Sequence, residues 1–130
     1  MQSLSRLLIT LVDELGGDTA KFAAIARNNI AYRMAVKNIW RDEQSRKLIF
    51  DHTNAFYIRE DKTPRKGTDK DKPYIVCDIV LDDGLVRSEI DTHRELLMAH
   101  LLNEGLRFEK INIIPAKGNM RKRHPFSAND

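Results

Sequence analysis

The clearest hydrophobic pattern, in the second half of the chain, predicts a strand, a turn, a helix and a second strand. A β-branched apolar run over residues 74–81 predicts the first strand, and an Asp-Asp-Gly turn that ends at Gly84 follows it. Helical spacing then predicts one helix over residues 85–104, with Gly105 at a left-handed C-cap, and residues 108–114 predict the next strand. The apolar stripe of this helix consists of Val86, Ile90, Leu97 and Leu101, with Leu96 beside it. Such a unit cannot bury its own apolar surface, so the rest of the chain must supply more sheet and more helix.

Helical spacing dominates the first half of the chain. Leucines recur on one face over residues 4–15 and predict a first helix that ends at Gly16-Gly17. A second helical region covers residues 19–50, and we expect a break at residues 40–43 because so long a straight helix is unusual in a small domain. The apolar stripe of this region is expected to be Phe22, Ile25, Ala26, Ile30 and Met34. Residues 55–60 then alternate in the manner of a strand.

These elements predict an α+β fold, with helices packed on a small antiparallel sheet of about three strands. The 130 residues are enough for one domain with a sizeable core. The polar segment 60–73 contains no apolar residue and joins two strands, so we expect a flexible, solvated loop there. We place the single domain at residues 1–116 and a basic C-terminal tail at residues 117–130.

Composition is typical of a soluble globular protein, with 42% hydrophobic and 32% charged residues. The apolar runs are too short to cross a bilayer and no secretory signal is visible, so we expect no membrane partner. The one cysteine, Cys77, excludes an internal disulfide and suits a reducing cytoplasm. Its position in the middle of an apolar strand favours a buried structural thiol over a nucleophile.

Motifs that carry chemistry are missing from the sequence. There is no Walker-type phosphate loop, no glycine-rich dinucleotide fingerprint and no nucleophile elbow. His93 and His100 lie two helical turns apart, which is too far for a zinc-binding pair, and the other histidines, His52 and His124, add no metal signature. We therefore expect a protein that is not an enzyme and has no cofactor, metal or small-molecule substrate.

Clusters of basic residues indicate a possible nucleic-acid partner more strongly than the net charge of +3 does. The densest cluster lies in the tail, where no carboxylate side chain occurs between Pro115 and Asn129. The candidate nucleic-acid-binding residues are Lys117, Arg121, Lys122 and Arg123 in the tail, Lys62, Arg65 and Lys66 in the loop, and Arg33, Lys37 and Arg41 in the second helical region. The alternatives are a solubilising terminus and a solvated helix face whose cations balance nearby carboxylates.

An ordered set of residues resembles a known bacterial family. Trp40 is followed after a dozen residues by the pair His52-Thr53, and strand residues IVCDIV precede the predicted helix. That helix carries Glu89-Ile90 and Leu96-Leu97, and Gly105 and Ile111 complete the pattern. In this order of elements the chain, over residues 4–114, resembles the family called domain of unknown function 721, which includes the DciA-type loaders of the replicative helicase.

The resemblance implies a fold similar to the K-homology domain and a role without catalysis. It also implies binding to single-stranded DNA or RNA and to the replicative helicase during bacterial DNA replication. The chain has no GXXG clamp, so it would not hold nucleotides in the usual K-homology manner. The leading hypothesis is a nucleic-acid-binding adaptor, and the alternative is a protein-interaction module with no nucleic-acid role. Basic residues gathered on one face would favour the adaptor, and scattered ones would favour the module.

Overall fold

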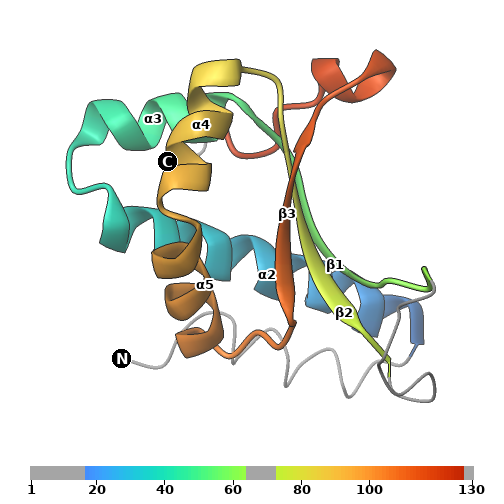
Figure 1. Ribbon diagram of the computed structural model, residues 1–130. Coiled ribbons are helices and arrows are strands. Elements are labelled where there is room, and N and C mark those ends of the chain that lie inside the picture. The colour runs from blue at the N-terminus through green and yellow to red at the C-terminus, as the bar shows by residue number, and fades with distance from the viewer. Residues whose placement is uncertain (1–16, 64–72, 128–130) are drawn as a thin grey trace.

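Helices packed on a three-stranded mixed sheet form the α+β fold in the computed structural model, which describes residues 17–63 and 73–127 (Figure 1). The helix expected over residues 4–15 lies outside the described residues, as does most of the loop. The described elements are α2 (Gly17–Ile39), α3 (Glu43–Asp51), β1 (Thr53–Glu60), β2 (Ile75–Leu81), α4 (Gly84–Thr92), α5 (Arg94–Asn103), β3 (Lys110–Pro115) and the 3₁₀ helix η1 (Gly118–Lys122). Among these helices none is long and apolar enough to span a bilayer.

The sheet has the strand order β1–β2–β3 and contains both kinds of pairing. β1 and β2 are antiparallel, with Tyr57 opposite Asp78, whereas β2 and β3 are parallel, with Cys77 opposite Ile111. The prediction of a purely antiparallel sheet is therefore wrong for the second pair. The reason is the crossover through α4 and α5, because a helical connection returns the chain to the end of the sheet at which the preceding strand began.

The break expected in the long helical region is confirmed. α2 ends at Ile39, and Asp42 caps α3 by accepting a hydrogen bond from the Ser45 backbone N–H at 2.9 Å. The two helices pack at an angle on the same side of the sheet (Figure 1).

The single helix expected over residues 85–104 is instead two helices. His93, with φ −104° and ψ 18°, leaves the helical conformation between α4 and α5. Val86 and Ile90 of α4 and Leu97 and Leu101 of α5 are nevertheless all buried, so the predicted stripe holds across the break. Gly105 has φ 101°, which confirms the left-handed cap after α5.

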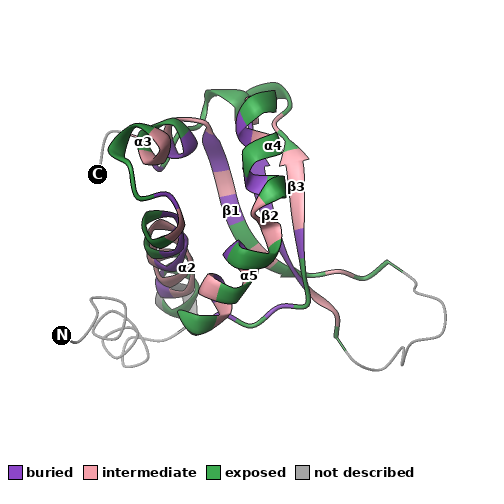
Figure 2. Ribbon diagram, turned by 60° about the vertical axis from the view of Figure 1, so that its left-hand side comes forward, coloured by how far each residue is buried: buried purple, intermediate pink, exposed green. Residues whose placement is uncertain are grey.

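The buried face of α2 differs from the predicted one. Phe22, Ile25 and Met34 are 70%, 57% and 43% exposed. The helix instead buries Ala31, Tyr32, Ala35 and Val36 against the sheet and α5. Tyr32 stacks on Phe56 of β1 with ring centroids 4.6 Å apart, so contact with the sheet decides which apolar side of α2 faces inward. Figure 2 shows the matching buried stretches on β1 and β2.

The central strand β2 is buried on both faces. Cys77, Ile79 and Leu81 face the helices, and burial raises the pKa of the Cys77 thiol, as expected for a structural cysteine. On the other face Asp78 is 1% exposed. Its carboxylate accepts hydrogen bonds from Arg59 Nε at 2.5 Å and from Asn112 Nδ2 at 3.0 Å, so the buried charge is paired.

The C-terminal segment after β3 packs on the domain as far as the structure describes it. Phe126 is 1% exposed and belongs to the main hydrophobic core. Asn54 Nδ2 donates to the carbonyls of Met120 at 3.1 Å and Arg123 at 2.8 Å, which fixes η1 beside β1. Packing against the core therefore extends beyond residue 116, the expected end of the domain, as far as Phe126.

Candidate nucleic-acid interface

Four of the predicted cations come together on or beside η1. These are Lys117, Arg121, Lys122 and Arg123, here called the η1 cluster, and all four are exposed. Within the described residues none of their side chains pairs with a carboxylate. Because Asn54 holds the backbone of η1 at both Met120 and Arg123, the cluster sits on a fixed element of the domain.

Arg33 has a packing role that occupies its side chain. Its guanidinium lies 5.3 Å from the centroid of the Phe50 ring and 5.0 Å from that of Phe126. It also donates hydrogen bonds to the carbonyls of Pro125 and Phe126, each at 3.3 Å. The structure thus places Arg33 as a clamp on the C-terminal segment.

The remaining predicted cations lie away from the η1 cluster. Lys37 and Arg41 are exposed at the C-terminal end of α2, which Figure 1 shows on the other side of the molecule from η1. Lys62 follows the C-terminal end of β1, whereas η1 contacts the residues at its start. Arg65 and Lys66 lie outside the described residues. The structure therefore gathers only the predicted tail residues into one site.

A polar cluster that sequence reasoning missed lies next to η1 and ties it to the end of β2. The Asp82 carboxylate meets His52 Nδ1 at 2.7 Å and His124 Nε2 at 2.8 Å, and it accepts a hydrogen bond from Asn54 Nδ2 at 3.0 Å. Burial acts to raise the pKa of Asp82, but the hydrogen bonds from His52, His124 and Asn54 outweigh it and lower the pKa below its ordinary value.

This lowered pKa predicts acid-sensitive stability. At a pH above its unfolded-state pKa, Asp82 is ionised in both the folded and the unfolded chain, and its hydrogen bonds stabilise the fold fully. As the pH falls below that value, the unfolded chain binds a proton before the folded chain does, so this stabilisation is lost. We expect Asp82→Asn to cost on the order of 2 kcal/mol near neutral pH, since hydrogen bonds to a charged group are lost. Urea unfolding should show the difference between wild type and variant shrinking as the pH falls from about 6 to about 3. A difference that stays constant over this range would contradict the assignment.

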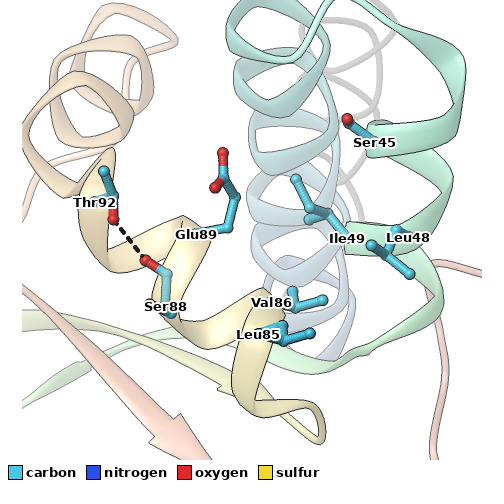
Figure 3. A pocket seen from close by; sticks show the side chains of 8 residues that line it. All are labelled: Ser45, Leu48, Ile49, Leu85, Val86, Ser88, Glu89 and Thr92. Atoms are coloured by element: carbon cyan, nitrogen blue, oxygen red, sulfur yellow. Dashed lines mark hydrogen bonds between the residues drawn. The ribbon is translucent and has the colours of Figure 1, made fainter.

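A groove with a volume of about 450 Å³ lies between α3 and α4, and both polar and apolar side chains line it (Figure 3). Leu48 and Leu85 line it and are 53% and 83% exposed. Glu89 is the carboxylate among the described residues that line the groove, and it accepts a hydrogen bond from Trp40 Nε1 at 2.9 Å. The Thr92 hydroxyl donates a hydrogen bond to the carbonyl of Ser88. The groove therefore offers apolar contact area, and the polar groups at Glu89 and Thr92 are already hydrogen-bonded.

Trp40 seals the junction of α2 and α3 against α4 and α5, as expected from its size. It is 6% exposed, and its ring centroid lies 5.0 Å from that of His93 in an edge-to-face arrangement. A buried indole of this kind cannot serve as a stacking platform for bases.

A second groove runs along β1, between the N-terminal half of α2 and the C-terminal segment, with a volume of about 620 Å³. No signal in the sequence reveals it, because the order of strands in the sheet cannot be read from the pattern of β1.

Among the described residues no group of three or more His, Cys, Asp and Glu side chains is placed to hold a metal ion. Comparison of the chain with protein-family models, with curated proteins and with solved structures finds no match in any of the three.

Proposed function

We propose that the chain is a non-enzymatic binding module that holds the phosphate backbone of single-stranded nucleic acid against the η1 cluster. The observation that supports this is the set of four exposed cations on one fixed 3₁₀ element, with no carboxylate partner within the described part of the chain. Two of the four are arginines, whose planar guanidinium groups suit phosphate oxygens.

Fixing the cluster to the domain also favours binding in energetic terms. A disordered basic tail must lose conformational freedom when it binds, whereas the backbone of η1 is already held by Asn54. Contacts to phosphates alone carry no sequence information, so the binding should be independent of sequence and strongly dependent on salt.

The test is a titration of a fluorescein-labelled oligo(dT) with the full chain at several salt concentrations. Each phosphate contact on a single strand contributes about 0.7 to the slope of log affinity against log salt. Changing Arg121, Lys122 and Arg123 together to alanine should weaken binding and flatten the slope by roughly two units. Folding should be unaffected, since these side chains are exposed.

The matched control removes the same charge elsewhere, at Lys37, Arg41 and Lys62. This triple alanine variant should keep the parent slope to within about half a unit. Equal losses in the two triple variants would show that charge in general, and not the η1 cluster, attracts the oligonucleotide. If the triple alanine variant of the η1 cluster binds as tightly as the parent at every salt concentration, the proposal is wrong.

The resemblance to helicase loaders extends this proposal to a protein partner, the replicative helicase, and to a K-homology-like mode of folding. Co-elution of the full chain with the replicative helicase of its source organism tests the extension. The exposed leucines of the α3–α4 groove, Leu48 and Leu85, are the described surface best suited to such a protein contact. A chain that elutes separately from the helicase, with and without oligo(dT), would leave only the nucleic-acid proposal.

A further inference from the structure

β1 is an edge strand of the sheet, and its outer backbone groups have no partner among the described residues. Asp61 N–H donates to the Tyr74 carbonyl at 2.7 Å, so the hydrogen-bonded positions of this antiparallel pair are 61, 59, 57 and 55. The alternate residues, Phe56, Ile58 and Glu60, therefore point their N–H and C=O groups away from β2. Within the described residues these groups make no hydrogen bond. An unpaired edge of this kind is a template for another strand.

Space for such a strand lies beside the edge, in the groove along β1 described above, here called the β1-edge groove. Its far wall is the N-terminal half of α2, where Ile25 is 57% exposed, and its end is closed by Met120 and Pro125. Strands in a sheet lie about 4.7–4.9 Å apart, so an added strand needs an open channel next to β1. The apolar wall supplies contact for every second side chain of that strand.

Two buried oxygen atoms in the lining of the groove also lack hydrogen-bond partners within the described ranges. Asn54 is 1% exposed, yet its Oδ1 has no hydrogen-bond partner among the described residues, although its Nδ2 is fully used. Asn28 Oδ1, on the α2 wall, is likewise buried and unpartnered. Both oxygens are acceptors, and an unpaired buried acceptor is costly, so both favour a ligand that brings N–H donors.

The charged side chains that line the groove are all positive in the part of the chain that the structure describes. They are Lys21 and Arg123, and no described carboxylate side chain lines it. Arg123 lies at the start of β1 through its contact with Asn54. The Tyr32 hydroxyl also lies at the start of β1, because it is hydrogen-bonded to Thr53 Oγ1 at 2.9 Å. Lys21 precedes Tyr32 in α2 by eleven residues, which is about 16 Å along the helix axis. The two cations therefore stand at opposite ends of the groove.

We propose that the β1-edge groove binds an extended peptide that adds a fourth strand to the sheet, with apolar side chains in its middle and acidic side chains at its two ends. The backbone of the peptide pairs with Phe56, Ile58 and Glu60. Its apolar side chains face Ile25 and the α2 wall, and its acidic side chains reach Lys21 and Arg123. Backbone pairing supplies affinity in such complexes, and the alternate side chains supply specificity.

The test uses fluorescence anisotropy with the full chain and pools of labelled, proline-free decapeptides capped at both ends. In the first pool Asp or Glu occupies both ends of the peptide, and Val, Ile or Leu alternates with Ser or Thr between them. In the second pool the acids are replaced by Lys or Arg, and in the third every second amide of the acidic pool is N-methylated. We expect saturable binding of the acidic pool alone, since N-methylation removes the backbone donors and the basic pool meets like charge.

Two surface variants locate the binding. Lys21→Glu and Ile25→Glu should each weaken the acidic pool at least about tenfold, which corresponds to 1.4 kcal/mol. The matched control is Leu48→Glu, at a leucine 53% exposed in the α3–α4 groove, which should bind within about twofold of the parent. Lys21 and Ile25 lie outside the η1 cluster, so their effect on peptide binding is separable from oligonucleotide binding. Circular dichroism confirms that each variant is folded.

Four outcomes would overturn the proposal. They are no binding of the acidic pool at about 1 mM, a limit of about −4.1 kcal/mol, equal binding of the N-methylated pool, full affinity in Ile25→Glu and Lys21→Glu, and equal weakening of oligo(dT) binding and peptide binding in Ile25→Glu. The last outcome would assign the β1-edge groove to a nucleic-acid strand.

Discussion

Phe126→Ala should destabilise the chain by about 3–5 kcal/mol, the usual cost of emptying a buried phenylalanine site. The Phe126 side chain is 1% exposed. Its ring centroid lies 5.1 Å from that of Tyr32, in an edge-to-face arrangement, and 6.3 Å from that of Phe50, in a stacked arrangement. It also holds the Arg33 guanidinium over its face. Urea unfolding followed by circular dichroism measures the loss. The effect is notable because a segment after β3 would ordinarily be expected to be removable.

The matched control is Phe22→Ala, which removes the same side chain from a site that is 70% exposed. This variant should stay within about 0.5 kcal/mol of the parent. Truncation after Arg123 should cost at least as much as Phe126→Ala, because it removes the same ring together with His124 and the carbonyls that accept from Arg33. A truncated chain as stable as the parent would show that the C-terminal segment does not support the core.

Trp40→Ala should cost a similar amount, about 3–5 kcal/mol, because the indole fills the junction between α2, α3 and the α4–α5 pair. Trp40→Phe keeps most of the packing but removes the hydrogen bond from Nε1 to Glu89, so it should cost only about 1 kcal/mol. Urea unfolding of the two variants separates packing from hydrogen bonding. Glu89→Gln keeps an acceptor and serves as the control.

Fluorescence offers an independent check, since Trp40 is the single tryptophan of the chain. Acrylamide should quench the native chain weakly and the urea-unfolded chain strongly, in keeping with 6% exposure. Ready quenching of the native state, or a cost below about 1 kcal/mol for Trp40→Ala, would place the ring outside the core.

The elements that the sequence predicted well are those with strong local signals. The segments over β2 and β3 are rich in β-branched residues, and the segment over β1 alternates. The break between α2 and α3 follows from the length of the helical region. Gly105 predicts the end of α5, because residues other than glycine rarely adopt a φ of 101°. The α+β class follows from these elements together.

The errors concern choices that only tertiary contact makes. Apolar residues lie on more than one side of α2, so periodicity could not choose between the predicted stripe and the face that carries Tyr32 and Val36. The sequence left open whether Phe126 packs on the domain or serves as an anchor, because one aromatic residue after a proline has no periodicity. The parallel pairing of β3, in contrast, was readable from the order strand, helix, strand.

The candidate site was predictable only in part. The tail cations were found from their density, and the structure keeps them together on η1. Arg33 shares their charge but packs on Phe50 and Phe126, a difference that charge alone cannot reveal. The Asp82 cluster joins residues far apart in the chain, and the β1-edge groove depends on strand order, so neither had a local signal.

The buried carboxylate of Asp78 has a consequence for strand alignment. Side chains alternate along β2, so a slip of one residue against β1 would turn Asp78 towards the helices and Cys77 and Ile79 away from them. The charge would then enter the apolar core and lose Arg59 and Asn112, its present partners. An unpaired buried charge costs far more than a misplaced apolar side chain. One acidic residue in the central strand thus opposes every alignment that is shifted by a single residue.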